Sequence, residues 1–199
     1  MIYTKDIRDY INKGQYEKDL EVLVQQAKTY VSYELLTNKK NKAVIIDIDE
    51  TILSNLPYIS QQVHLNDVEK LNRWQMTSQC VVIEPILSFY QWLLKQDLRI
   101  YFITARSLEL KEATIENFKK LNIPYSQILF RDQAQWPIPK EFKIAMRKNI
   151  VNNDYDIILN VGDQPTDFEG GYWKRALKVP NPFYIESKLT WHKDRGVAA

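Results

Sequence analysis

Apolar positions at helical spacing define the first predicted element of this chain. Tyr16, Leu20, Leu23, Ala27 and Tyr30 recur at intervals of three and four residues, which predicts an amphipathic helix before the polar break at residues 38–42. Similar patterns predict further helices at about 66–74, from Pro85 onward, from a Ser107 cap to about Leu121, and at about 140–151.

Short apolar runs lie between the helical segments and predict buried strands at 43–48, 98–103, 128–130 and 157–161. Strands that alternate with helices imply right-handed crossovers and a parallel sheet with helices on both faces. We therefore expect a Rossmann-like, three-layer α/β fold in a single domain over residues 1–199. Residues 1–41 form an N-terminal helical segment, and residues 52–83 form a small cap-like insertion between the first two strands.

Composition narrows the class of protein. The chain has 199 residues, with 27 basic and 25 acidic residues and a formal net charge of +2. A nucleic-acid surface would need a clustered basic excess, so no nucleic-acid partner is expected. No run approaches the ~20 apolar residues of a membrane helix, and the N-terminus shows no signal segment, so the chain as given is typical of a cytoplasmic protein.

The scarce residue types exclude several chemistries. Cys80 is the single cysteine and His64 and His192 are the two histidines, so thiolate and imidazole zinc sites are not expected. The five glycines form none of the common phosphate-binding loops. Chemistry in this chain should therefore rest on carboxylates, hydroxyls and lysines, with a hard cation if a metal is bound.

Acidic residues follow two of the predicted strands. Asp47 and Asp49 come after the first strand, and Asp163 and Asp167 after the fourth, with Gly162 allowing a tight turn before them. Ligands of open parallel sheets bind beyond the carboxyl ends of the strands. Each aspartate alone is equally well explained as a turn residue. Together, four carboxylates at one edge repel one another unless a cation neutralises them, and this favours a magnesium site.

Four segments, in order, resemble the motifs of the haloacid dehalogenase (HAD) superfamily of phosphohydrolases. Motif one is matched by AVIIDIDETILSN, motif two by IYFITARS, motif three by FKIAMRK and motif four by ILNVGDQPTDFEGG. The spelling of motifs one and four and the closing PNPFYI are similar to subfamily IIIB acid phosphatases, which include the class B and class C bacterial enzymes and plant vegetative storage proteins. The resemblance spans about residues 42–185.

The resemblance implies a role for each motif residue. Asp47 is the expected nucleophile that forms an aspartyl-phosphate, and Asp49 the general acid and then base. Thr104 would donate to a phosphoryl oxygen, and Lys143 would offset negative charge. The expected cofactor is Mg²⁺, held by Asp47, Asp49 (through its backbone carbonyl), Asp163 and Asp167. Lys140 and Lys148 lie near the same helix, so the choice of Lys143 rests on its alignment with the family motif.

The expected substrates are small phosphate esters, with 5′-nucleotides among them. Tyr58 and Trp74 match aromatic positions that flank the leaving group in class C relatives, although both residues would equally serve to cover the core. Arg106 matches the family arginine of motif two and is a candidate site-shaping residue, but Ala105 replaces the usual glycine before it.

The same resemblance leaves alternative functions open. An aspartyl-phosphate also permits phosphotransfer to an alcohol acceptor, and some plant relatives are non-catalytic storage proteins. The resemblance suggests a periplasmic or secreted location, against the cytoplasmic character of the chain as given. Oligomeric state cannot be read from the sequence.

Overall fold

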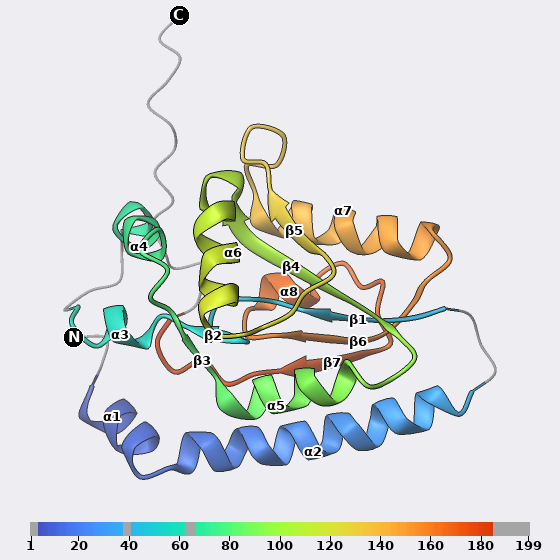
Figure 1. The fold of residues 1–199 in the computed structure, drawn as a ribbon, viewed down its shortest axis with the longest axis horizontal. Coiled ribbons are helices and arrows are strands. Elements are labelled where there is room, and N and C mark those ends of the chain that lie inside the picture. The colour runs from blue at the N-terminus through green and yellow to red at the C-terminus, as the bar shows by residue number, and fades with distance from the viewer. Residues whose placement is uncertain (1–3, 38–40, 63–66, 185–199) are drawn as a thin grey trace, which may run out of the picture.

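A five-stranded parallel sheet forms the centre of the protein (Figure 1). In the computed structural model, which describes residues 4–37, 41–62 and 67–184, the strand order is β5-β4-β1-β6-β7. The strands are β1 (Lys42–Ile46), β4 (Arg99–Ser107), β5 (Ile128–Arg131), β6 (Asp156–Gly162) and β7 (Arg175–Lys178). All four neighbouring pairs are parallel. The predicted α/β class and the four predicted strands are confirmed.

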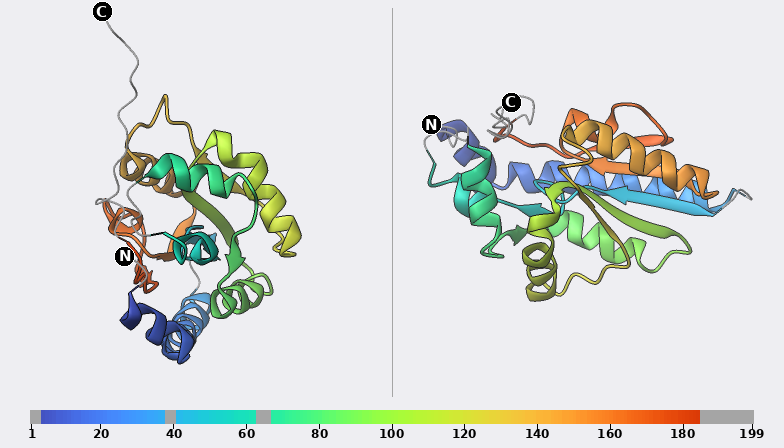
Figure 2. Two further views of the ribbon diagram at one scale, coloured as in Figure 1. Left: turned by 90° about the vertical axis from the view of Figure 1, so that its left-hand side faces the viewer. Right: turned by 90° about the horizontal axis from the view of Figure 1, so that it is seen from above.

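Helices cover both faces of the sheet, and β1 shows why. Val44 and Ile46 pack into one core with α2 (Gln15–Leu35), α5 (Glu84–Leu93) and α6 (Lys111–Lys120). Ala43 and Ile45 pack into a second core with α7 (Pro139–Asn152). Successive side chains of a strand point to opposite faces, so a run that is apolar throughout is buried on both. Figures 1 and 2 show the resulting three layers.

The segment between β1 and β4 includes residues 52–83, for which a small cap-like insertion is predicted. It contains β2 (Leu53–Ser54), α3 (Leu56–Ile59), α4 (Val68–Gln75) and β3 (Val81–Val82), and β2 pairs with β3 in a separate antiparallel ribbon. α3 and α4 lie beyond the carboxyl ends of the central strands (Figure 2). The expected start of a helix at residue 66, together with His64 and His192, falls outside the described residues.

Some short elements escape the sequence patterns. β7 has four residues at the sheet edge, of which only Leu177 is buried, so it lacks the apolar run of a central strand. α1 (Lys5–Asn12), capped by the side chain of Thr4, lies in the expected N-terminal helical segment but ahead of the helix that the apolar spacing predicts. α8 (Pro165–Phe168) was not expected. Within the described residues, no helix is both long and apolar enough to cross a membrane.

Ser107 departs from the expected helix cap. β4 continues through residues 104–107, and a short 3₁₀ helix at Leu108–Leu110 follows before α6 begins at Lys111. Ser107 precedes this 3₁₀ turn, but its side chain makes no capping hydrogen bond. The expected hydroxyl cap is therefore wrong, because the turn between β4 and α6 separates Ser107 from the first turn of the α-helix.

Candidate active site

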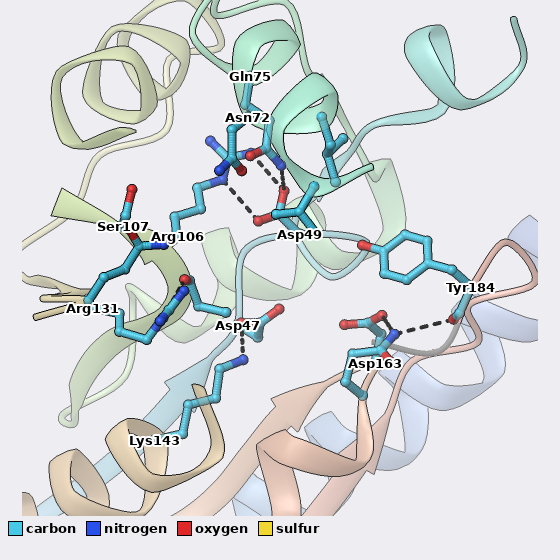
Figure 3. Close-up of a pocket in the computed structure, with 15 residues that line it drawn as sticks. Asp47, Asp49, Asn72, Gln75, Arg106, Ser107, Arg131, Lys143, Asp163 and Tyr184 are labelled. Carbon is cyan, nitrogen blue, oxygen red and sulfur yellow. Dashed lines mark hydrogen bonds and ion pairs between the residues drawn. The ribbon is translucent and has the colours of Figure 1, made fainter. Parts of the chain in front are cut away.

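A cavity opens at the carboxyl ends of β1, β4 and β6 (Figure 3). Asp47 and Asp49 reach it from the segment after β1, Arg106 from the end of β4 and Asp163 from the end of β6. Helices supply the rest of the charged and polar wall, with Lys143 from α7 and Gln75 from α4. Segments far apart in the chain thus converge where parallel αβ sheets bind their ligands.

Lys143 joins the first and fourth motifs. Its ammonium group lies 2.7 Å from Asp47 Oδ1 and also contacts Asp167 Oδ1. All three residues are buried. Of the three candidate lysines, Lys140 is half exposed and pairs with Glu169 at 2.5 Å, and Lys148 is exposed. The structure therefore places Lys143, and neither alternative, beside Asp47.

Asp163 is held by three side chains from different parts of the chain. Asn181 Nδ2 donates to its Oδ2 at 2.7 Å, Gln164 Nε2 donates to the same oxygen, and Thr51 Oγ1 lies 3.4 Å from Oδ1. The backbone N–H of Gln164 donates to Asp167 Oδ2 at 2.8 Å. Both carboxylates are consequently fixed in orientation.

Three of these carboxylates could hold a cation together. Oxygen atoms of Asp47, Asp163 and Asp167 all lie within 4.8 Å of one another. Burial raises the pKa of the Asp47 and Asp163 carboxyls well above the ordinary value, and the neighbouring carboxylates raise both further. These three carboxylates are buried, offer only oxygen ligands and carry more negative charge than Lys143 neutralises. They therefore fit Mg²⁺, which takes oxygen ligands.

Asp49 turns away from this cluster and toward Arg106. Arg106 Nε donates to Asp49 Oδ2 at 2.9 Å and Nη2 donates to Oδ1 at 2.7 Å. Gln75 Nε2 and Asn55 Nδ2 each donate to Oδ1 at 2.9 Å. Burial raises the pKa of the Asp49 carboxyl, but the charge and hydrogen bonds of Arg106 outweigh burial, so that pKa is lowered.

The side chains of Asp47 and Asp49 diverge because β1 ends at Ile46. If strand geometry continued to residue 49, both side chains would leave the same face of the sheet, but the chain turns after Ile46 instead. Thr104 is fully buried, and its hydroxyl oxygen accepts the backbone N–H of Arg106 at 3.1 Å. It is not among the described residues that line the cavity, and its role as a phosphate donor stays a prediction.

Gly162 matters for space rather than for a turn. Its φ is outside the left-handed region, and a Cβ built on it would overlap the carboxylate of Asp167. Glycine at the end of β6 therefore lets the Asp167 side chain lie against the strand backbone.

Arg147 and Asn160 donate hydrogen bonds to backbone carbonyls of the fourth motif, and neither residue was predicted from the sequence. Arg147 lies one helical turn after Lys143 on α7 and is buried. Its guanidinium donates to the carbonyls of Asp167 (2.6 Å) and Gly171 (2.9 Å), and Asn160 Nδ2 donates to the Asp167 carbonyl at 2.7 Å. The spacing of Lys143 and Arg147 on one helix face was the available signal.

Tyr58 and Trp74 lie together but away from the cavity wall. Their ring centroids are 5.6 Å apart. Trp74 packs against the main core, Tyr58 packs near Ile59 and Phe183, and neither belongs to the described cavity lining. From α4 the cavity receives Gln75 and, one turn earlier, Leu71. Gln75 was also missed, because a lone glutamine has no sequence signature.

Buried carboxylates and a lysine at the carboxyl edge of a parallel α/β sheet form the arrangement that the four motifs predict for a phosphohydrolase. The chain belongs to the HAD superfamily, subfamily IIIB (Acid phosphatase), whose sequence model matches residues 2–187. This membership confirms the resemblance of the four motifs and identifies an acid phosphatase-like phosphoric monoester hydrolase.

Individual relatives agree with the family. The chain is 32% identical to the stem 31 kDa glycoprotein of Glycine max over 90% of this chain and 73% of the relative. It is 27% identical to acid phosphatase 1 of Solanum lycopersicum, over 89% and 72%. The class C acid phosphatase from Bacillus anthracis with tungstate bound has the same fold, with a TM-score of 0.70 and 20% identity over 94% of this chain and 89% of that one.

Proposed function

We propose that the protein is a Mg²⁺-dependent phosphomonoesterase that acts on small phosphate esters through an aspartyl-phosphate on Asp47. The observation that carries the proposal is the position of Asp47, which lines the cavity 2.7 Å from Lys143 Nζ and lies within 4.8 Å of carboxylate oxygens of Asp163 and Asp167. A nucleophile in this position attacks a phosphoryl group whose negative charge is matched by Lys143.

Asp47, Asp163 and Asp167 would hold the Mg²⁺, joined by the backbone carbonyl of Asp49. When bound, the ion supplies positive charge to the phosphoryl oxygens and neutralises the carboxylate cluster. Lys143 orients Asp47 by its 2.7 Å hydrogen bond and bridges it to Asp167.

In the first step, one carboxylate oxygen of Asp47 forms a bond to phosphorus while the bond from phosphorus to the ester oxygen breaks. Asp49 gives a proton to the departing oxygen, which leaves as the alcohol. In the second step, Asp49 takes a proton from a water molecule that attacks phosphorus. The bond to Asp47 breaks, and inorganic phosphate leaves.

Hydrolysis of p-nitrophenyl phosphate tests the proposal directly. We expect turnover with Mg²⁺, none in EDTA, and none for Asp47→Asn, which is close to isosteric and keeps the fold. Acid quenching of Asp49→Asn during turnover should trap phosphate on the protein, because the second step lacks its base. Turnover that persists in Asp47→Asn would overturn the assignment of the nucleophile.

The same assay separates the alternatives. Formation of a new phosphate ester in the presence of an added alcohol would identify phosphotransfer. A complete lack of hydrolysis with Mg²⁺ across pH 4 to 8 would favour the storage role. A periplasmic or secreted location stays a prediction, tested by fractionation of expressing cells.

The expectation of 5′-nucleotide substrates rests on Tyr58 and Trp74, which pair outside the cavity lining. We therefore keep small phosphate esters as the proposed class. If a base does stack on Tyr58, Tyr58→Ala should raise the KM for a 5′-nucleotide but leave the KM for glycerol 3-phosphate unchanged.

A further inference from the structure

The cavity has a second polar wall that the proposed chemistry does not use. Ser107 at the end of β4 and Arg131 at the end of β5 are register neighbours in the sheet, and both line the cavity that contains Asp47. They are only 4% and 2% exposed. Figure 3 shows them on the opposite side of the cavity from Asp163 and Tyr184.

Ser107 has an unmet hydrogen-bonding group at this wall. Among the described residues, its Oγ is the one buried side-chain nitrogen or oxygen that has no hydrogen-bond partner. A buried hydroxyl without a partner is costly, and native proteins rarely keep one without a reason. Because Ser107 lines an open cavity, a ligand atom that accepts a hydrogen bond can supply the missing partner.

Arg131 is rigidly positioned beside it. Its Nε donates to the Ala105 carbonyl at 3.0 Å, and its Nη1 donates to the carbonyls of Trp136 and Pro137 at 3.0 and 3.1 Å. These three bonds to backbone carbonyls fix the plane of the guanidinium. A cation fixed in advance binds an oxyanion at little entropic cost.

Two other buried cations of the cavity, Lys143 and Arg106, bind carboxylates. Lys143 lies between Asp47 and Asp167, and Arg106 binds Asp49 with two hydrogen bonds. α4 contributes both apolar and polar side chains to the same cavity, namely Val68, Leu71, Asn72 and Gln75. A leaving group that enters this cavity meets these side chains together with the Ser107 hydroxyl and the Arg131 guanidinium.

We propose that Ser107 and Arg131 form a leaving-group subsite for an oxyanion, so that the preferred substrates are phosphate monoesters whose leaving group carries a carboxylate or a second phosphate. This inference rests on the proposed phosphatase function and specifies its substrate class. The shared chemistry is an anionic oxygen that accepts from Ser107 Oγ and pairs with Arg131.

Matched substrates test the subsite. In the carboxylate arm, 3-phosphoglycerate is compared with glycerol 3-phosphate, which differs by a hydroxymethyl group in place of the carboxylate. In the phosphate arm, propane-1,3-diol bisphosphate is compared with 3-hydroxypropyl phosphate, after correction for its two equivalent phosphates. We expect kcat/KM to be about tenfold or more higher for the anionic member of at least one pair.

Variants assign that preference to the two residues. Ser107→Ala removes a hydroxyl that has no partner, so it should fold normally while reducing the preference about tenfold. Arg131→Lys keeps a charge but loses the fixed plane, and should reduce the preference further. Ser126→Ala is the matched control, because Ser126 donates to the Ile100 carbonyl, away from the cavity, and its loss should leave the preference unchanged.

The outcomes distinguish the subsite from the phosphatase function itself. A preference in one arm alone identifies the oxyanion as carboxylate or phosphate. Turnover of p-nitrophenyl phosphate and both neutral esters with no preference in either arm overturns the subsite alone, as does an unchanged preference in Ser107→Ala. No turnover of any ester, p-nitrophenyl phosphate included, overturns the proposed function and with it the subsite.

Discussion

The guanidinium of Arg106, near the end of β4, donates two hydrogen bonds of 2.9 and 2.7 Å to the carboxylate of Asp49, which lies just beyond β1. The pair is largely buried, with the Arg106 side chain 1% and the Asp49 side chain 20% exposed. Asp49 is the proposed acid and base, so its orientation in the cavity is set by an arginine of the second motif.

Arg106→Met should destabilise the protein strongly, because it leaves the Asp49 carboxylate buried without its cation. We expect the free energy of unfolding to fall by about 3 kcal/mol, measured by urea denaturation. The double variant Asp49→Asn, Arg106→Met should lose less than the sum of the two single variants. Arg73→Met removes an exposed cation 3.8 Å from Glu69 and should change little. Strictly additive losses would contradict a direct coupling.

Gln75→Met should reduce kcat about tenfold while leaving KM nearly unchanged. Gln75 Nε2 donates to Asp49 Oδ1 at 2.9 Å and to Asn55 Oδ1 at 3.3 Å, so its loss removes one of the donors that orient the Asp49 carboxylate. Steady-state kinetics with p-nitrophenyl phosphate measures the split. Gln61→Met serves as control, since Gln61 is exposed and its side chain donates to the Pro57 carbonyl, not to Asp49. An unchanged kcat in Gln75→Met would remove Gln75 from the positioning of Asp49.

Lys143→Met should lower kcat by at least a hundredfold, because the substituted side chain offers no charge to Asp47 or to the phosphoryl group. It also leaves three buried carboxylates facing one another, so the variant should depend on Mg²⁺ for stability more than the wild type does. Melting temperatures with and without Mg²⁺ measure this effect. Lys140→Met, on the same helix but paired with Glu169 at the surface, should behave as wild type in both assays. If both variants lost activity equally, Lys143 would not be the lysine of the third motif.

Gly162→Ala should weaken Mg²⁺ activation without abolishing the fold. The added methyl group overlaps the Asp167 carboxylate and displaces it from Asp47 and Asp163. We expect the Mg²⁺ concentration for half-maximal activity to rise about tenfold or more, in line with the effect of disturbing groups around a metal site. Asp167→Asn should raise it in the same way. Gly162→Ala with unaltered Mg²⁺ dependence would show that Asp167 does not need its present position.

Glu50 predicts a pH dependence of stability. Burial raises its pKa from 4.5 to about 7, against the lowering effect of hydrogen bonds from Asn55 N–H and Ser54 Oγ. Between pH 4.5 and about 7, Glu50 therefore holds a proton in the native state that it has lost in the unfolded state. Its contribution to the free energy of unfolding is full below pH 4.5 and declines as pH rises toward 7. Urea denaturation between pH 5 and 7 should show this decline in the wild type. In Glu50→Gln the free energy of unfolding should fall less steeply with pH than in the wild type. An equally steep fall would assign the effect to other groups.

The layered architecture and the candidate residues for the chemistry could be predicted from the sequence. Runs such as residues 43–46, apolar at every position, are typical of strands buried on both faces, and they place the residues that follow them at one edge of the sheet. The motif letters then predicted roles for Asp47, Asp163 and Lys143, because their types and order resemble those of one family. The small edge strand β7 stayed hidden because it buries too little to leave a pattern.

How these groups face one another could not be predicted from the sequence and is seen only in the folded chain. The turn after Ile46 separates Asp47 from Asp49, Arg106 and Gln75 fix Asp49 from two different elements, and Tyr58 and Trp74 pack on each other outside the cavity wall. The sequence likewise predicts Ser107 as a helix cap, and the lack of a hydrogen-bond partner for its hydroxyl is seen only in the structure. Hydrophobic spacing predicts which side of a helix or strand is buried, because that depends on neighbouring residues in the sequence. The hydrogen-bond partners of a polar side chain depend on elements that meet only in the folded chain.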